Sequence, residues 1–209
     1  MNITAIVVGL EKWQEYTRPA LESIRKTNPD MDVICVDNGS EEPYGVVPGT
    51  TMVKSAEKRS YAGGINVGLK YAPRSSWYII LNNDVLFYKD IMDRFVELDP
   101  QVLYGFKLWP MGTAGMPTQY LCGWCLFLSD YMYDRIGDFD ERCAPMFFED
   151  ADYSIRVLKE DMELVELDRK DWGLRHLEDE RMGERVDYYR RFSAARQSVR
   201  NYIKRKHGY

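Results

Sequence analysis

Residues 77–84 read Trp77-Tyr78-Ile79-Ile80-Leu81-Asn82-Asn83-Asp84, an apolar run that ends at three polar residues. Apolar runs of this length, rich in aromatic and β-branched side chains, are typical of strands buried on both faces of a sheet. Two similar runs precede it, from Ile3 to Val8 and from Met31 to Val36, and the second ends at the turn-forming residues Asp37-Asn38-Gly39-Ser40. Three buried strands of this kind indicate an α/β protein.

The segments between these three runs have the length and pattern of helices. One helix is expected over residues 13–27 and a second from the loop at residues 59–64 to Tyr71, with a short strand over residues 51–54 between them. Strands that alternate with helices form parallel sheets, because each crossover returns the chain to the same end of the sheet. We therefore predict a mostly parallel central sheet with helices on both faces.

Polar residues follow two of these strands at the point where each strand ends. Asp37 follows the second run, and Asn82, Asn83 and Asp84 follow the third. In an open α/β sheet, ligands bind outside the carboxyl ends of the strands, so both groups belong to one candidate site. A divalent cation held by one or two carboxylates neutralises a diphosphate. Asp84 is thus a candidate ligand of Mg²⁺ or Mn²⁺, and a plain turn is the alternative.

The segment from Lys58 to Gly68 has glycines where the second helix is expected to begin. Glycines at such a place let backbone amides approach a ligand closely, although a tight loop that caps a helix has the same pattern. The spacing matches neither the dinucleotide-binding fingerprint nor a P-loop, so those two nucleotide sites are not predicted.

The second half of the chain has a less regular pattern. Strands are expected over residues 102–108 and 120–128, and a helix from about Phe148 to Lys159. The loop from Pro110 to Pro117, with two glycines and two prolines, is long enough to be a mobile flap.

Two adjacent carboxylates, Glu149 and Asp150, follow a pair of aromatic residues where this last helix begins. Apolar surroundings and a neighbouring charge raise the pKa of a carboxyl, which suits a base that takes a proton from a hydroxyl. The alternative is that these acids only stabilise the amino end of an exposed helix, with Asp152 paired to Arg156 one turn later.

The formal charge of −5 argues against generic nucleic-acid binding, but the charge is unevenly distributed. From Arg185 to the end there are eight basic residues and one acid, and His207 in this tail is expected at the surface. Apolar residues recur there at helical spacing: Tyr188, Phe192, Ala195, Val199 and Tyr202. We predict a main domain over residues 1–180 and a basic amphipathic helix over residues 181–209. Its apolar stripe either packs on the domain or docks on an anionic membrane or a lipid-linked acceptor.

The four cysteines, Cys35, Cys122, Cys125 and Cys143, are expected to be reduced thiols. Cys122 and Cys125 would face opposite sides of a strand, and no second pair completes a zinc site. No apolar run reaches the roughly 18 residues that span a bilayer. We expect a cytoplasmic protein, with peripheral contact at the inner face of a membrane if the basic helix docks there.

Together these segments resemble the family 2 glycosyltransferases of the GT-A fold, in particular the rhamnosyltransferase-like branch. The most specific part is Ile136 to Glu141 with Phe148 to Arg156, which is similar to Gly-Gly-Phe-Asp-Glu…Glu-Asp-x-Asp-Leu-x-x-Arg. Arg59 to Gly68 resembles the family's Asn-x-Gly-Phe-Ala-Gly-Gly-Asn-x-Gly segment. Leu81 to Asp84 stands where the family has its Asp-x-Asp-like metal motif.

The resemblance implies a role for each matching residue. The nucleotide sugar would be bound by Asp37, Ser60, Ala62, Gly64, Asn66, Asn82, Asn83 and Asp84. Asp84 would hold Mg²⁺ or Mn²⁺, and His176 falls where the family has a histidine that completes the metal shell. Asp150, or else Glu149, would be the general base, and Gly123-Trp124 would lie on the acceptor side.

The implied activity is inverting transfer of a hexosyl or deoxyhexosyl group from a nucleotide-diphosphate sugar to the hydroxyl of a glycan, a lipid-linked sugar or another acceptor. A sugar-nucleotide nucleotidyltransferase and an inactive nucleotide-sugar-binding module are the alternatives. The first would have a glycine-rich loop with a basic residue directly after the opening strand, where this chain has Gly9-Leu10-Glu11-Lys12. The chain departs from the family's pattern at two places. After the opening strand it has Gly9-Leu10-Glu11 where the family has Tyr-Asn, and after His176 it has Leu177-Glu178-Asp179 where Gly and Ser are usual.

Overall fold

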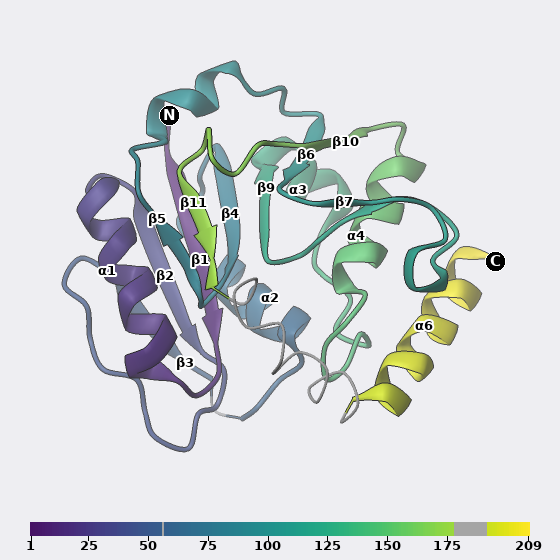
Figure 1. Ribbon diagram of the computed structural model, residues 1–209, viewed down its shortest axis with the longest axis horizontal. Helices are drawn as coiled ribbons and strands as arrows, with labels where there is room; N and C mark the ends of the chain where they lie inside the picture. The colour runs from purple at the N-terminus through teal and green to yellow at the C-terminus, as the bar shows by residue number, and fades with distance from the viewer. Residues whose placement is uncertain (56, 178–191) are drawn as a thin grey trace.

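The buried apolar runs form the centre of a sheet in the computed structural model, which describes residues 1–55, 57–177 and 192–209 (Figure 1). In this described part the sheet has seven strands, in the order β10-β6-β9-β4-β1-β2-β3. They are β1 (Ile3–Gly9), β2 (Asp32–Asp37), β3 (Thr51–Lys54), β4 (Trp77–Asn82), β6 (Val102–Gly105), β9 (Cys125–Ser129) and β10 (Glu163–Glu166). The four strands predicted in the first half are confirmed to within one residue at each end.

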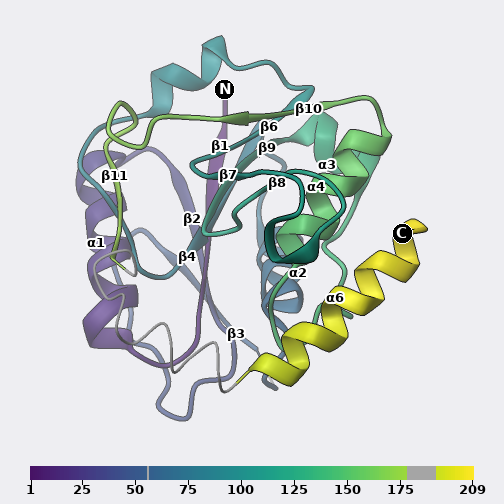
Figure 2. The same ribbon diagram turned by 45° about the vertical axis from the view of Figure 1, so that its right-hand side comes forward.

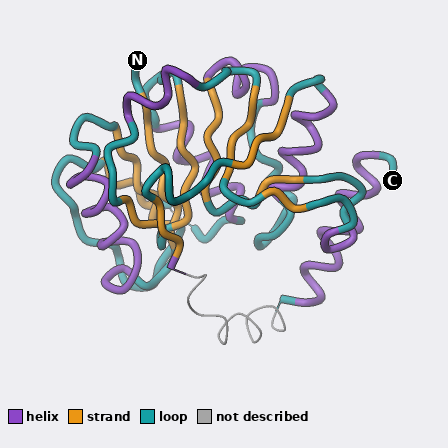
Figure 3. The backbone as a smooth tube through the Cα atoms, turned by 45° about the horizontal axis from the view of Figure 1, so that its top comes forward, coloured by secondary structure: helices purple, strands orange, loops and turns teal. Residues whose placement is uncertain are grey.

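The direction of the strands explains where polar side chains gather. β1 pairs in parallel with β2 and β4, β2 with β3, and β6 with β10. β9 is antiparallel to both of its neighbours, β4 and β6. Among these strands, which lie side by side in Figure 3, only β9 is reversed, and this confirms the mostly parallel sheet. The carboxyl ends of the other strands and the amino end of β9 therefore meet at one edge.

Helices cover both faces of the sheet, as predicted (Figure 1). Leu21 of α1 lies in the same core as Ala5 of β1, whereas Ile65 of α2 shares the core on the other face with Ile6. The helices are α1 (Arg18–Thr27) after a π-helical turn (Trp13–Thr17), α2 (Tyr61–Tyr71), α3 (Asp130–Ile136) and α4 (Glu149–Lys159), with short 3₁₀ turns at Met92–Glu97 and Thr113–Gly115.

Two glycines let α2 pack closely on β1. A Cβ atom on Gly68 would lie 2.3 Å from Ile6 Cγ2, and one on Gly64 would lie 2.6 Å from Val8 Cγ1. Real Cβ atoms do not approach other atoms so closely, so a larger residue at either position would push the helix away from the strand. Both glycines therefore fix the distance between helix and sheet.

Two short antiparallel strand pairs lie beside the central sheet. β5 (Val85–Phe87) pairs with β11 (Leu174–His176), and β7 (Leu108–Trp109) pairs with β8 (Tyr120–Leu121). The continuous strands predicted over residues 102–108 and 120–128 are therefore wrong. The chain leaves the sheet before β9, because the N–H of Gly123 donates to Asp150 Oδ2 at 2.9 Å instead of to a neighbouring strand. The four cysteines are free, as predicted.

The basic C-terminal segment forms α6 (Ser193–His207), which lies beside α4 and the loop between β7 and β8 (Figure 2). Its side chains Val199 and Ile203 are buried together with Tyr120 and Ile155. The guanidinium of Arg200 donates to Ala114 O at 3.2 Å, so the loop predicted as a flap contacts this helix. Of the two alternatives for the apolar stripe, the described range 192–209 thus shows packing on the rest of the protein.

Asp152 on α4 anchors the end of α6 electrostatically. This fully buried carboxylate has Oδ1 at 2.6 Å from Lys206 Nζ and at 2.8 Å from His207 Nε2. Its Oδ2 accepts from Arg156 Nε at 2.9 Å, which confirms the pairing expected across one helical turn. The expected surface position of His207 is wrong, because its ring is buried against Asp152.

The predicted domain boundary at residues 180 and 181, and Tyr188 of the predicted helix, lie outside the described residues. Within the described ranges, no helix combines the length and the apolar character that crossing a bilayer requires.

Candidate active site

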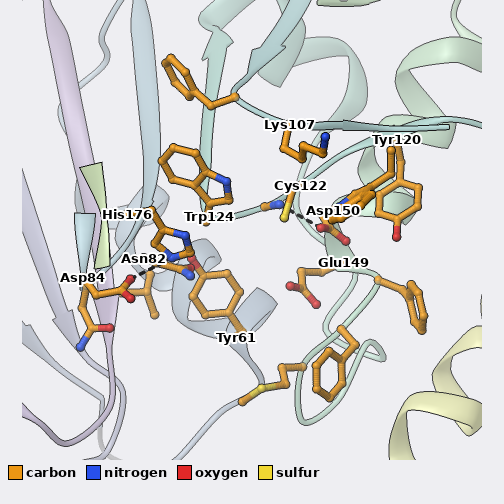
Figure 4. Close-up of a pocket in the computed structure, with 18 of the residues that line it drawn as sticks. Tyr61, Asn82, Asp84, Lys107, Tyr120, Cys122, Trp124, Glu149, Asp150 and His176 are labelled. Atoms are coloured by element: carbon orange, nitrogen blue, oxygen red, sulfur yellow. Dashed lines mark hydrogen bonds and ion pairs between the residues drawn. The ribbon is translucent and has the colours of Figure 1, made fainter. Parts of the chain in front are cut away.

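The carboxyl edge of the sheet borders an open cavity of about 1860 Å³. The ends of β1 and β4 contribute Gly9 and Asn82 to its lining, Phe106 follows β6, and Trp124 precedes β9. The loops before α2 and α4 provide further walls (Figure 4). The cavity therefore lies at the edge where the sequence predicts a ligand site.

Asp84 and His176 meet at one end of this cavity (Figure 4). The pairing of β11 with β5 sets His176 opposite Val85 and hence beside Asp84. His176 Nε2 lies 3.2 Å from Asp84 Oδ1. The ring of Trp124 stacks on the imidazole with the ring centroids 4.8 Å apart and the planes 5° from parallel. Strand pairing and ring stacking together hold the imidazole next to the carboxylate.

The Asp84–His176 pair has donor atoms that fit a divalent cation. Asp84 Oδ1 is buried, and its contact with the imidazole lacks hydrogen-bond geometry, so no hydrogen bond from the described residues satisfies this oxygen. Carboxylate oxygens are preferred ligands of Mg²⁺ and Mn²⁺, and an imidazole nitrogen is a second donor. Among the described residues, no three His, Cys, Asp or Glu side chains form a metal-binding group. Most of an octahedral shell would thus be left to diphosphate oxygens and water.

The two asparagines before Asp84 differ in what they contact. Both line the cavity, and the backbone N–H of Asn82 donates to Trp124 O at 3.0 Å. The side chain of Asn83 donates to Thr17 Oγ1 at 2.8 Å. Asn83 therefore ties the turn to the start of α1, and the Asn82 backbone ties it to β9.

Asp37 is buried at the end of β2 and does not belong to the described lining of the cavity. Its Oδ1 accepts from Ser40 N at 2.9 Å, and its Oδ2 accepts from Tyr44 N at 3.3 Å. These bonds order the loop after β2, from which Asn38 does line the cavity. Contact between Asp37 and a nucleotide stays a prediction.

The four residues predicted from the glycine-containing segment do not belong to the described lining of the cavity, and they stabilise the start of α2 beside it. Ser60 Oγ accepts from Gly63 N at 3.1 Å and so caps α2, and the buried Ala62 and Gly64 face the core. The side chain of Asn66 bonds to both the N–H and the C=O of Phe139. From this segment the cavity is lined by Lys58, Arg59 and Tyr61 instead. Ligand contacts of Ser60, Ala62, Gly64 and Asn66 stay predictions.

Glu149 and Asp150 begin α4 on the side of the cavity away from Asp84 (Figure 4). Asp150 accepts two backbone hydrogen bonds, from Gly123 N to Oδ2 at 2.9 Å and from Ala151 N to Oδ1 at 2.8 Å. Glu149 Oε2 is buried and accepts no hydrogen bond from a described residue. The two carboxyls thus lie side by side but in different polar surroundings.

Burial is the main cause that raises the pKa of both carboxyls. The pKa of Glu149 rises to about 8, with the charge of Asp150 as the second cause. The pKa of Asp150 rises only to about 6, because the N–H groups of Gly123 and Ala151 stabilise its ionised form. The two N–H groups therefore favour the ionised form of Asp150, and the unbonded, buried carboxyl of Glu149 favours its protonated form.

Replacing Glu149 with Gln should reduce the pH dependence of stability. Native Glu149 keeps its proton up to about pH 8, whereas a carboxyl of this type in the unfolded chain ionises near pH 4.5. The native state binds more protons in this window, so the wild type loses stability as pH rises, by on the order of a few kcal/mol. Calorimetry should show a larger fall in Tm from pH 5 to pH 8 for wild type than for Glu149→Gln.

A matched control is Glu163→Gln, at an exposed position on β10, which should show the wild-type fall in Tm. Equal falls in all three proteins would contradict the buried proton on Glu149.

The cavity also has cationic and aromatic walls that the sequence did not identify. They include Lys58, Arg59, Lys107, Arg169, Lys170 and Arg196, with Tyr61, Trp109, Tyr120, Phe147 and Phe192. A signal existed for Lys107 and Arg169, because they follow β6 and β10 at the edge where Asn82 ends β4. No local pattern connects Phe192 and Arg196 with this cavity, because the packing of α6 brings them there.

No protein-family model and no curated protein sequence matches this chain. Solved structures do match. A mannosyltransferase from Pyrobaculum calidifontis, PcManGT in complex with GDP-Man and Mn²⁺, has a TM-score of 0.61 and 16% identity over 80% of this chain and 55% of its own. GalNAc-T7 with UDP, GalNAc and Mn²⁺ has a TM-score of 0.65 and 8% identity, covering 78% and 41%. TarS of S. aureus has a TM-score of 0.57 and 14% identity, covering 79% and 35%.

These similarities show that the chain has the GT-A fold, which confirms the predicted fold class. Because the sequence identities are low, these structural similarities show a shared fold and no closer relationship. Membership of family 2 and of its rhamnosyltransferase-like branch therefore stays a prediction. The chain spans about half or less of the length of these three proteins.

Proposed function

We propose that this protein is a glycosyltransferase that moves a sugar from a nucleotide-diphosphate donor to an acceptor hydroxyl. The observation that carries the proposal is one cavity with two chemically different ends, Asp84 beside His176 and Glu149 beside Asp150. A leaving diphosphate needs its charge neutralised and an attacking hydroxyl needs a base, and each end suits one of these tasks. Mannosyltransferase PcManGT with GDP-Man and Mn²⁺, which has the same fold, supports this proposal.

The diphosphate of the donor is assigned to the Asp84 end. Mg²⁺ or Mn²⁺, held by Asp84 and His176, would stabilise the negative charge that develops on the leaving nucleoside diphosphate. Lys58 and Arg59 on the adjoining wall add positive charge for the phosphates. The amides of Asn82 and Asn83 flank this end of the donor. Asp37, Ser60, Ala62, Gly64 and Asn66 contribute by holding the loop after β2 and the start of α2.

Asp150 is the proposed general base. It is ionised near neutral pH and accepts the proton of the acceptor hydroxyl while that oxygen attacks the anomeric carbon. The bond from the anomeric carbon to the donor phosphate breaks with its electron pair, and the nucleoside diphosphate leaves. Attack opposite the leaving group inverts the configuration of the sugar. Glu149 is the less favoured base, because its higher pKa keeps it protonated.

The acceptor is proposed to bind beside Gly123 and Trp124, where Gly123 fixes the Asp150 carboxylate. Aromatic side chains such as Trp109 and Tyr120 line the cavity and offer flat apolar surfaces for a sugar ring. A glycan or a lipid-linked sugar is therefore the favoured acceptor. Transfer of a hexosyl or deoxyhexosyl group, a cytoplasmic location and contact of the basic α6 with a membrane belong to the same proposal.

Thermal unfolding with nucleotide sugars tests this function. GDP-mannose, UDP-glucose, UDP-N-acetylgalactosamine and dTDP-rhamnose would each be added with Mn²⁺ or with EDTA. At least one donor should raise Tm, and more so with Mn²⁺, because a ligand that binds only the native state stabilises it by mass action. Free mannose and glucose serve as controls that lack the diphosphate. The absence of any shift with all four donors would contradict the proposal.

A further inference from the structure

Tyr61 lies between the two ends of the cavity (Figure 4). It is the first residue of α2, and its backbone N–H donates to Pro145 O at 2.9 Å in the loop that leads to Glu149. Its side chain lines the cavity together with Asp84 on one side and Glu149 on the other. The helix and this loop together fix where the ring enters the cavity.

The hydroxyl of Tyr61 is buried and makes no hydrogen bond with any residue that the structure describes. A buried polar group without a partner costs about 1–3 kcal/mol, so such a group is uncommon in a folded protein unless it has a use. The hydroxyl is also a permanent donor. Burial, and then the nearby carboxylates of Glu149 and Asp84, raise its pKa well above 10.

We propose that the Tyr61 hydroxyl donates a hydrogen bond to a hydroxyl oxygen of the transferred sugar and thereby determines which sugar is accepted. This inference rests on the proposed function. With the diphosphate at Asp84 and the acceptor at Asp150, the group that occupies the space between them is the sugar of the donor.

A site built to hydrogen-bond a substrate hydroxyl rejects an analogue that lacks it, because the buried partner is then left unpaired. We therefore expect the donor to be a nucleotide sugar whose sugar ring has a hydroxyl group directed at Tyr61. A monodeoxy sugar that lacks this hydroxyl is expected to be a poor donor.

Tyr61→Phe removes only the hydroxyl and keeps the ring. For the donor that the wild type turns over fastest among GDP-mannose, UDP-glucose, UDP-N-acetylgalactosamine and dTDP-rhamnose, we expect kcat/KM to fall by about 10- to 100-fold. Among monodeoxy analogues of that donor, one should be used equally slowly by wild type and Tyr61→Phe. The Tm of the variant should equal or exceed that of wild type, because an unpaired buried hydroxyl has been removed. A merely structural role would lower Tm instead.

The matched control is Tyr71→Phe, which changes the exposed tyrosine at the other end of α2 and should leave kcat/KM unchanged. Wild-type kcat/KM in Tyr61→Phe, or the same loss with every monodeoxy donor, would overturn the role of Tyr61 while leaving the proposed function intact. If the wild type turns over none of the four donors, the proposed function fails and this inference fails with it.

Discussion

Replacing Asp150 with Asn should lower kcat for sugar transfer by about 10²- to 10⁴-fold, the usual contribution of a general base. Asn has the shape of Asp, and its amide oxygen can still accept the hydrogen bond that Gly123 N donates to Oδ2 at 2.9 Å, whereas its NH₂ group cannot accept the one from Ala151 N. The cavity should therefore keep its form, and the Kd of the donor should change by no more than about threefold. What the variant lacks is an oxygen that can take the proton of the acceptor hydroxyl.

Initial rates at saturating donor, with donor binding by calorimetry, would measure both effects. Asp168 also lines the cavity, and Asp168→Asn is the control that should retain transfer. In the wild type, kcat should fall as pH drops below the raised pKa of Asp150, about 6, because protonation removes the base. A wild-type rate in Asp150→Asn would contradict the assignment, and a comparable loss in Glu149→Gln alone would move the base to Glu149.

Replacing Asp84 with Ala should abolish the effect of Mn²⁺ on donor binding. The carboxylate offers a buried oxygen beside His176, and among the described residues no other carboxylate joins them in a metal-binding group. Without this oxygen, the imidazole alone holds a hard cation poorly. We expect the donor's Kd in Mn²⁺ to rise by at least about tenfold, which corresponds to roughly 1.4 kcal/mol. In EDTA the variant and the wild type should bind the donor equally.

Calorimetric titration of the donor into wild type and Asp84→Ala, with Mn²⁺ and with EDTA, gives the four Kd values that this comparison needs. Asp150→Asn is the matched comparison, because it should keep the Mn²⁺ effect while losing transfer. Retention of the full Mn²⁺ effect in Asp84→Ala would contradict this metal site. A lower Tm of Asp84→Ala than of wild type without metal would indicate a folding defect. In that case Asp84→Asn, which keeps the volume of the side chain, would be used in place of Asp84→Ala.

The sheet could be predicted from the sequence because its central strands are continuous apolar runs. Residues 77–82 are buried on both faces until Asn82, so composition alone marks the strand and its end. The edge of the sheet follows, since parallel strands bring their carboxyl ends together. Asp84 was predicted in this way, and the structure places it in the lining of the cavity. Glu149 and Asp150 were predicted because two adjacent acids begin a helix. The structure adds that burial raises the pKa of both, and that the N–H groups of Gly123 and Ala151 keep the pKa of Asp150 lower.

Features that depend on contacts between distant segments were missed. The single strand expected over residues 120–128 is interrupted because Asp150, far along the chain, accepts the N–H of Gly123. The burial of His207 depends in the same way on Asp152, which no local pattern connects with the C-terminal tail. The neighbouring positions of Asp84 and His176 were implied by the family resemblance alone, because they follow from the pairing of β5 with β11, two strands of three residues that have no periodic signal.

The glycine-containing segment illustrates an ambiguity that sequence cannot resolve. Gly64 and Gly68 are compatible with close approach of a ligand and with close approach of a strand, and the strand is what they contact. The cavity is lined instead by Arg59 and Tyr61, the residues on either side of the helix cap Ser60. Which side of a loop faces a ligand depends on the direction in which the helix leaves it, and this direction is set by packing on β1.

The identity of the nucleotide product tests the central proposal most directly. The wild type would be incubated with Mn²⁺, each of the four nucleotide sugars and a mixture of glycan and lipid-linked sugar acceptors, and the products separated by ion-exchange chromatography. We predict free nucleoside diphosphate from at least one donor, in an amount equal to the sugar transferred, and none above background with Asp150→Asn. Release of pyrophosphate on incubation with nucleoside triphosphates and sugar 1-phosphates, or no product from any donor, would contradict a glycosyltransferase.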